Sequence, residues 1–139
     1  VNGKNMALGT RGGNNTSDKV FLLSENEVHN SNTADSYGFV KNPNIYDEAR
    51  RCKNSTFARA MGSYSDIGGS NCCWWWLRSP GYNDVFAVTV NINGGVSCSG
   101  SVVNTDNYAV RPALHLDLSA SGIYRYAGAV CSDGSEDNL

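Results

Sequence analysis

The side chains able to do acid–base, nucleophilic or metal chemistry are few in this sequence and form no known catalytic motif. The only histidines are His29 and His115. Neither has a carboxylate and a nucleophile beside it in a recognisable order, so surface or strand-face roles are predicted for both. No G-x-S-x-G, P-loop or metal-binding triad occurs. Asp133, Glu136 and Asp137 are predicted to form a solvated acidic tail, and no catalytic residue, metal site or cofactor is expected.

The cysteines give no disulfide or zinc pattern. There are five of them, so at least one has no partner within the chain: Cys52, Cys72, Cys73, Cys98 and Cys131. Neighbouring cysteines such as Cys72 and Cys73 rarely bridge without strain, and no C-x-x-C pair is present. Mostly free, partly buried thiols are the prediction, and the redox compartment stays open.

Two arginines and three tryptophans are the strongest structural candidates. Arg78 and Arg111 each lie near a proline and a strand-like run. A guanidinium there is predicted to clamp backbone carbonyls or carboxylates that hold loops in place. Trp74, Trp75 and Trp76 are consecutive and are predicted to anchor the core from an interior strand. A platform that stacks on bases or sugars is the alternative interpretation.

Length and charge limit the classes of function. The chain has 139 residues, and its formal net charge of −2 with a pI near 5.6 argues against a phosphate-binding or nucleic-acid-binding protein. No apolar run reaches the length that spans a bilayer. One domain over residues 1–131 is expected, followed by a flexible tail over residues 132–139. Because the first residue is Val, the chain is predicted to be a processed or excised piece.

The elements expected in the first half are short. Residues 19–23 contain four consecutive apolar residues after Lys19 and predict a buried strand. Ser24 with Glu27 has the spacing of a capping box that opens a short helix. Residues 30–44 are polar and predict a loop. Helical spacing of apolar residues runs from Ile45 to Met61, with a break near residues 53–56. An i,i+4 ion pair between Asp47 and Arg51 is expected in the first of these two helices.

The second half predicts a series of strands. Residues 73–77 form the densest apolar run and predict an interior strand that ends in a turn over residues 78–81. Short apolar runs follow over residues 82–109, and Asn93-Gly94-Gly95 is typical of a hairpin. Residues 109–118 alternate apolar and polar types after Pro112, which indicates a half-buried closing strand.

Two motifs carry a resemblance to a known family. Trp75-Trp76-Leu77-Arg78-Ser79-Pro80-Gly81 is followed about thirty residues later by Val110-Arg111-Pro112-Ala113-Leu114. With Asp18–Ser24 and Asp47–Cys52 they resemble, over residues 12–118, a bacterial domain family of unknown function from gut Gram-positive bacteria and their phages. That family is similar to the variable proteins of diversity-generating retroelements, which have a C-type-lectin-like fold. Members carry further chain upstream, so an upstream segment or a second chain is expected to complete the fold.

The resemblance implies a hypervariable surface over residues 82–108. In retroelement systems an error-prone reverse transcriptase miscopies adenines, so that Asn codons scatter to other residue types. Sixteen residues in this interval can arise from Asn codons in that way and are the predicted ligand-binding residues: Tyr82, Asn83, Asp84, Val85, Phe86, Thr89, Asn91, Ile92, Gly95, Ser97, Cys98, Ser99, Ser101, Val102, Thr105 and Tyr108. The residues between them are the predicted frame: Ala87, Val90, Gly94, Val96, Gly100, Val103, Asp106, Val110 and Arg111.

The fold implied is α+β and C-type-lectin-like (formylglycine-generating-enzyme-like), with short helices on a small twisted antiparallel sheet and long loops. The function implied is binding of a protein or cell-surface ligand, at a cell surface, in secreted form or on a phage particle. Tyr82, Phe86 and Tyr108 are the expected aromatic anchors. The calcium-dependent sugar motifs of animal lectins are absent from the sequence, so sugar binding through calcium is not expected.

Two other functions stay open. Formylglycine-generating oxidases belong to the same fold superfamily and use cysteines and copper, and Cys72, Cys73 or Cys98 would then be active. Alternatively, the chain is a non-catalytic structural surface module whose Asn, Ser and Gly loops keep it soluble. Sister copies of the gene would then differ evenly along the chain, whereas a binding surface predicts differences concentrated in residues 82–108.

Overall fold

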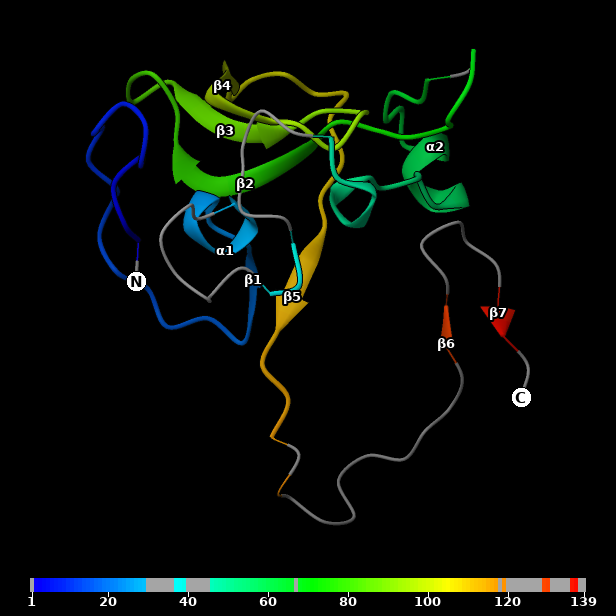
Figure 1. The fold of residues 1–139 in the computed structure, drawn as a ribbon, viewed down its shortest axis with the longest axis horizontal. Helices are drawn as coiled ribbons and strands as arrows, with labels where there is room; N and C mark the ends of the chain where they lie inside the picture. Colours follow the sequence, from blue (N-terminus) through cyan, green and yellow to red (C-terminus); the bar gives the residue numbers. More distant parts are fainter. Residues whose placement is uncertain are drawn as a thin grey trace.

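The computed structural model describes residues 2–29, 37–39, 46–66, 68–117, 119, 129–130 and 136–137. Short helices and strands follow one another along the chain (Figure 1). In chain order they are β1 (Val20–Leu22), α1 (Glu25–His29), the 3-10 helix η1 (Glu48–Arg50), α2 (Thr56–Ala60), β2 (Trp75–Pro80), β3 (Phe86–Val90), β4 (Val96–Val102), β5 (Pro112–Leu114), β6 (Ala129–Val130) and β7 (Glu136–Asp137).

The strands of the described residues form three small antiparallel sheets, which confirms the predicted α+β class. The largest has the order β2-β3-β4, while β1 pairs with β5 and β6 with β7. In the part of the chain that the structure describes, no helix has the length and apolar character needed to cross a bilayer. The predicted tail lies mostly outside the described residues, and within it Glu136 and Asp137 pair with β6.

The capping box before α1 is confirmed. The backbone N–H of Ser24 donates to Glu27 Oε2 at 2.7 Å, and the N–H of Glu27 donates back to Ser24 Oγ at 3.3 Å. These bonds satisfy amide groups that the first turn of a helix leaves free. The Arg78 guanidinium binds the same Glu27 carboxylate with two hydrogen bonds, at 2.7 and 2.9 Å. Burial disfavours ionisation of Glu27, but the Arg78 and Ser24 bonds outweigh it and lower its pKa.

The helices predicted between Ile45 and Met61 are shorter and less buried than expected. Ile45 lies outside the described residues, and the predicted break separates η1 from α2. The expected Asp47–Arg51 pair is wrong, because Asp47 caps η1 through the N–H of Ala49 and Arg51 binds Glu48 instead. Phe57, whose spacing predicted a core position, is 74% exposed.

The core lies between α1 and one face of the β2-β3-β4 sheet, here called the inner face. Its buried members are Leu23, Val28, Cys73, Trp75, Leu77, Val88, Val90, Val96 and Ala109. The edge of β2 that does not face β3 is also hydrogen-bonded, because the N–H of Trp76 donates to Ala109 O and that of Arg78 to Leu23 O. Segments far apart in the sequence thereby hold both sides of β2.

Only one of the three tryptophans anchors the core. Trp75 is fully buried and donates from Nε1 to the backbone carbonyl of Arg50 at 3.0 Å. Trp74 and Trp76 are half-buried and lie on the opposite, outer face of the sheet, because successive strand residues alternate between faces. The prediction of a core role for Trp74 and Trp76 is therefore corrected.

Three arginines fasten loops to this core. Arg78 donates to the carbonyl of Leu22 at 2.6 Å. Arg111 lies over the Trp75 ring, 5.3 Å from its centroid, and donates to the carbonyl of Ala49 at 3.3 Å. Arg50, which the sequence analysis did not single out, is completely buried and donates from Nε to the carbonyl of Gly94 at 2.6 Å. Each guanidinium thus ties a loop or strand end to a distant backbone segment.

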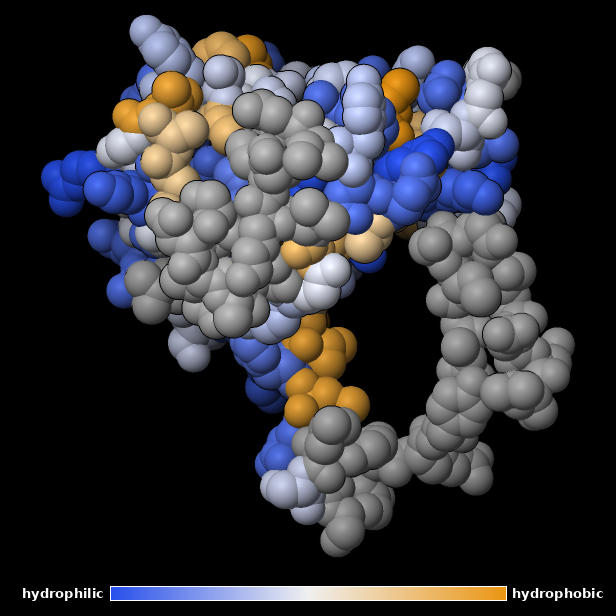
Figure 2. Space-filling model, in the orientation of Figure 1, coloured by the Kyte–Doolittle hydropathy of each residue, from blue (hydrophilic) through white to orange (hydrophobic). Residues whose placement is uncertain are grey.

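The closing strand is shorter than the predicted one. β5 covers Pro112–Leu114 and pairs with β1 in the register Phe21 with Ala113. Leu114 and Leu116 are more than half exposed. Figure 2 shows apolar residues in small separate groups, one of them along the chain that leaves β5 and another at the upper edge over β4.

Candidate functional site

The outer face of the β2-β3-β4 sheet carries aromatic and hydroxyl side chains. The strand register places Trp76, Thr89 and Ser97 in one row across the three strands. The Tyr108 ring lies 5.4 Å from the Trp74 ring and 5.0 Å from the Trp76 ring, measured between centroids. Tyr108 also accepts a hydrogen bond from Ser101 Oγ at 3.2 Å. Four of the sixteen predicted ligand-binding residues, Thr89, Ser97, Ser101 and Tyr108, therefore lie on one face, but Thr89 is completely buried, so its predicted ligand-binding role is corrected.

A second group of predicted residues lies at one end of this sheet. The loop between β2 and β3 contains Tyr82, Asn83, Asp84 and Val85, and it is hydrogen-bonded to the second half of β4 and the turn after it. The N–H of Tyr82 donates to Ser99 O, and the N–H of Val103 donates to Val85 O. Tyr82 is 67% exposed, Val85 48% and Val102 38%. Thr105 closes the turn by donating from Oγ1 to Val102 O.

Glycines permit the close approach of these segments. Gly81 is buried against Ser99 and Phe86, and a Cβ there would overlap the carbonyl oxygen of Ser99. Gly100 has a φ of +73° in the middle of β4, where two registers of pairing with β3 are joined by a bulge. The bulge explains why Ser99 is exposed although Ser97 and Ser101 on either side of it pair with β3.

The remaining predicted residues lie elsewhere. Asn91, Ile92 and Gly95 belong to the β3–β4 hairpin at the other end of the sheet. Phe86 is half-buried beside Gly81, so its predicted role as an exposed anchor is corrected. Cys98 was predicted to face outward, but it lies on the inner face, where it packs against the core. Strand alternation from the buried Val96 accounts for this placement.

Only some of the predicted frame residues are buried. Val90 and Val96 are buried, and Gly94 has a φ of +80° with the Asp47 backbone directly beside it. Val103 and Val110, in contrast, are 58% and 61% exposed and do not hold the backbone from inside. Within residues 82–108, some positions such as Gly94 therefore leave no room for a larger side chain, whereas exposed positions such as Val103 do.

Comparison with known protein families gives one match. The sequence profile of DUF6273, a domain of unknown function, matches residues 1–118. The chain belongs to the DUF6273 family. The match includes both the W-W-L-R-S-P-G and the V-R-P-A-L motifs and agrees with the predicted membership in a family of unknown function. No curated protein and no solved structure matches the DUF6273 domain of this chain.

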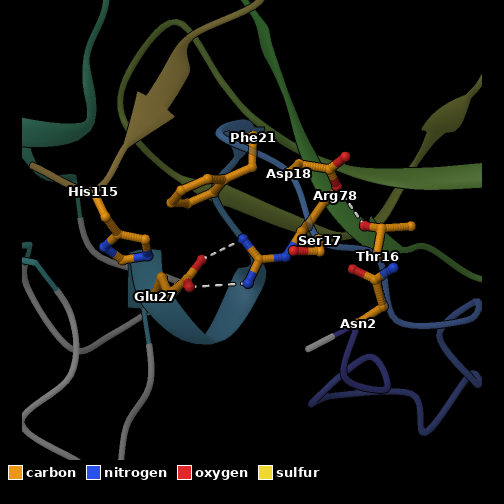
Figure 3. Close-up of a pocket in the computed structure, with 8 residues that line it drawn as sticks. All are labelled: Asn2, Thr16, Ser17, Asp18, Phe21, Glu27, Arg78 and His115. Carbon is orange, nitrogen blue, oxygen red and sulfur yellow. Dashed lines mark hydrogen bonds and ion pairs between the residues drawn. The ribbon is translucent and has the colours of Figure 1, made fainter.

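A hollow of about 270 Å³ lies beside Arg78 in this DUF6273 domain, away from the predicted residues (Figure 3). Its charged groups already have partners, because Arg78 pairs with Glu27 and Asp18 accepts from Thr16 Oγ1. The Arg78 side chain also passes 5.6 Å from the Phe21 ring centroid. The hollow therefore offers a ligand no free charge from either Arg78 or Glu27.

The thiols of the DUF6273 domain fall into two places. Cys73 is fully buried and donates from Sγ to the carbonyl of Cys52 at 3.1 Å. The hydrogen bond from Cys73 and the charge of Arg111 lower the pKa of Cys52 to about 7, against the opposing effect of burial. Cys72 is buried and forms no disulfide, and Cys98 lies beside His29 in a separate cluster.

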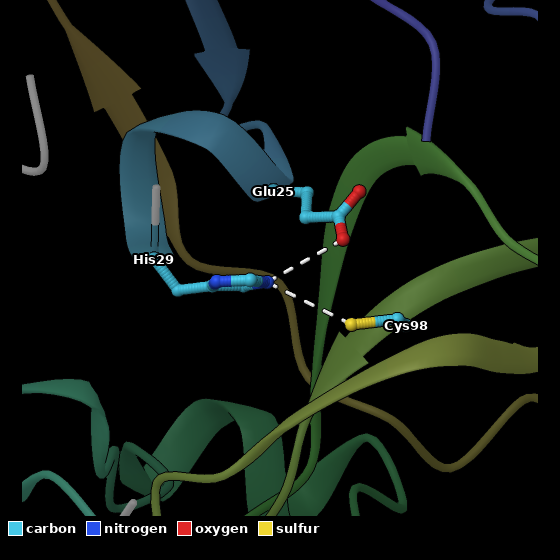
Figure 4. Close-up of side chains that lie close together, drawn as sticks. All are labelled: Glu25, His29 and Cys98. Carbon is cyan, nitrogen blue, oxygen red and sulfur yellow. Dashed lines mark hydrogen bonds and ion pairs between the residues drawn. The ribbon is translucent and has the colours of Figure 1, made fainter. Parts of the chain in front are cut away.

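Cys98 lies in a buried cluster that the sequence analysis missed. His29 Nε2 is 3.4 Å from Glu25 Oε1 and 3.7 Å from Cys98 Sγ (Figure 4). Glu25 is 0% and His29 6% exposed, so the surface role predicted for His29 is wrong. The spacing Glu-x-x-x-His on one helix was the available signal, since residues four apart share a helix face. Cys98 is 69 positions away from His29, and only the fold brings it there.

Proposed function

We propose that this DUF6273 domain is a binding protein that presents a rigid surface to a protein partner. The display surface, as we define it, consists of the outer-face residues Ser97, Ser101 and Tyr108 with the sheet-end residues Tyr82, Asn83, Asp84, Val85, Ser99, Val102 and Thr105. The observation that carries the proposal is the hydrogen-bonded meeting of the loop before β3 with the end of β4. It gathers exposed apolar and hydroxyl side chains from two chain segments.

The chemistry of the display surface suits a protein partner. Tyr82 and Tyr108 offer large rigid rings, while Ser99 and Ser101 offer small hydroxyl groups that adapt to different hydrogen-bond partners. This combination is typical of antibody-like binding surfaces. The formal net charge of the chain is −2, which provides little attraction for a nucleic acid. Buried aromatic anchors would supply most of the binding energy, with the hydroxyl groups setting orientation.

We further propose that the display surface is diversified by a retroelement and that the fold is C-type-lectin-like. Support comes from the contrast between neighbouring positions of one interval. A Cβ at Gly94 or Gly100 would overlap backbone atoms, whereas Tyr82 and Val85 project into solvent. Exchange of the exposed residues would therefore change the ligand without disturbing the backbone.

Site-specific photocrosslinking tests the binding proposal. A photoreactive amino acid is placed at Tyr82 or at Val102 of the full chain, and the protein is exposed to intact bacterial cells. We expect covalent adducts with a specific surface protein, competed by unmodified chain. A competitor carrying Tyr82→Ser and Val102→Ser should fail to compete, because it lacks the exposed apolar side chains at the sheet end.

The matched control places the same photoreactive group at Phe57, which is more exposed than Tyr82 or Val102 but lies on α2. Adducts with the same protein from Phe57, or full competition by the double variant, would contradict the proposal. Enzymatic removal of cell-surface glycans should leave the adduct in place. Loss of the adduct after that treatment would identify a glycan as the ligand and reject a protein partner.

A further inference from the structure

The cluster of Glu25, His29 and Cys98 joins α1 to β4 beneath the sheet. The three side chains offer a carboxylate oxygen, an imidazole nitrogen and a sulfur, and these atoms all lie within 4.8 Å of one another. Figure 4 shows the carboxylate and the thiol both approaching the same imidazole nitrogen, Nε2. We propose that this cluster is a zinc-binding site that cross-links α1 to β4.

The distances between the side chains match tetrahedral coordination. Zinc lies about 2.0–2.1 Å from nitrogen and oxygen ligands and about 2.3 Å from sulfur, so tetrahedral angles separate nitrogen from oxygen by about 3.4 Å and nitrogen from sulfur by about 3.6 Å. In the structure these separations are 3.4 Å for His29 to Glu25 and 3.7 Å for His29 to Cys98. The third separation, between Glu25 and Cys98, lies within 4.8 Å, so the three side chains can share one ion and leave a fourth position for water.

The hydrogen bonding at the cluster is incomplete without a cation. Glu25 Oε1 is buried and accepts no hydrogen bond among the described residues, and its contact with His29 Nε2 at 3.4 Å is an ion pair only when the imidazole is protonated. Buried carboxylate oxygens are costly to leave unpaired. The arrangement also differs from a nucleophile relay, in which thiol and carboxylate bind opposite nitrogens of the imidazole. Here both approach Nε2, as ligands of one ion would.

The charges of the cluster balance around a divalent ion. Zinc binding requires the Cys98 thiol to lose its proton, because the thiolate is the form that binds a metal ion. When Zn²⁺ binds, that proton leaves to solvent, and the thiolate and carboxylate together neutralise the ion. A mixed set of thiolate, imidazole and carboxylate suits zinc, whereas a carboxylate is a poor ligand for the softer Cu⁺.

The N-terminal segment holds two of the three ligands in place. The N–H of Met6 donates to Glu25 Oε2 at 2.7 Å, which fixes the other carboxylate oxygen. Asn5 is completely buried and donates from Nδ2 to the carbonyl of Cys98 at 2.8 Å. Such supporting hydrogen bonds orient ligands in established metal sites. The zinc site goes beyond the proposed binding function and does not depend on it.

Metal titration of the full chain tests the site. With a phosphine reductant present, we expect Zn²⁺ to bind with one-to-one stoichiometry in calorimetry and to raise the melting temperature. Co²⁺ should give the near-ultraviolet absorption of a thiolate–cobalt bond. Cys98→Ser should remove that absorption and weaken zinc binding by more than about 100-fold, since loss of supporting residues alone costs 10–100-fold. Cys52→Ser, which removes a free thiol outside the cluster, should change neither result.

Glu25→Gln is the second variant and nearly preserves shape, so it guards against misfolding of the cysteine variant. Circular dichroism of each metal-free variant should match that of the parent, and Glu25→Gln should also lose zinc affinity. Absence of stoichiometric binding by the parent chain would overturn the site. So would a cobalt–thiolate absorption that survives in Cys98→Ser, or one that disappears in Cys52→Ser alone.

Discussion

Trp75→Ala is expected to lower the free energy of unfolding by about 3–5 kcal/mol, the range found when large aromatic side chains are removed from protein cores. The side chain is fully buried in the cluster that joins α1 to the sheet. Its loss also leaves the carbonyl of Arg50 without the indole donor and removes the ring beneath Arg111. In thermal unfolding the melting temperature should fall by roughly 10 °C or more.

Phe57→Ala is the matched control for this prediction. Phe57 is 74% exposed, so its removal should change the free energy of unfolding by no more than about 0.5 kcal/mol. Equal destabilisation by the two substitutions would contradict the assignment of the core to the inner face of the sheet. A tolerated Trp75→Ala would contradict it as well.

Gly100→Ala is expected to destabilise the chain by about 3 kcal/mol or more. Gly100 has a φ of +73°, a conformation that costs other residues about 1–2 kcal/mol. In addition, a Cβ at this position would overlap the backbone carbonyl of Ala87 on β3, and a backbone atom cannot move aside without breaking the sheet. Urea unfolding followed by circular dichroism measures the effect, with the midpoint shifted to lower urea at an unchanged slope.

Gly13→Ala serves as the control for Gly100→Ala. A Cβ at Gly13 meets no atom within 4 Å, and its φ is not in the left-handed region. We expect a change within about 0.5 kcal/mol for that substitution. A mild effect of Gly100→Ala, comparable to the control, would show that the β4 bulge is not rigid and would weaken the proposal of a fixed backbone under an exchangeable surface.

Local signals in the sequence predicted local structure well. The Ser24–Glu27 capping box and the hairpin at Asn93-Gly94-Gly95 are both present, since each depends on residues a few positions apart. The helical spacing between Ile45 and Met61 predicted a buried apolar face, but in the described part the buried residue of η1 is Arg50 and α2 has none. Phe57 and Met61 there are exposed, because the two helices have single turns that contribute no residue to the buried core cluster.

The sequence did not predict which residues that are far apart in the chain lie in contact. The codon pattern marked Cys98 and Thr89 as variable but did not indicate which side of a strand each residue faces. In the structure Thr89 is completely buried and Cys98 packs against the core. Alternation from Val96 would have placed Cys98 inside, and the bulge at Gly100 then resets the pattern for Ser101. The meeting of Cys98 with His29 depends on how α1 packs against β4, which no local spacing encodes.

Comparison of sister copies of this gene, with the DNA that flanks them, most directly tests whether a fixed scaffold presents an exchangeable surface. We predict that the differences concentrate at the display surface, are confined to adenines of a nearby template repeat, and leave Trp75, Gly94 and Gly100 unchanged. A reverse transcriptase gene should lie close by. Differences spread evenly along residues 1–118, or concentrated at the buried valines of β3, would contradict a diversified binding surface and favour a structural module.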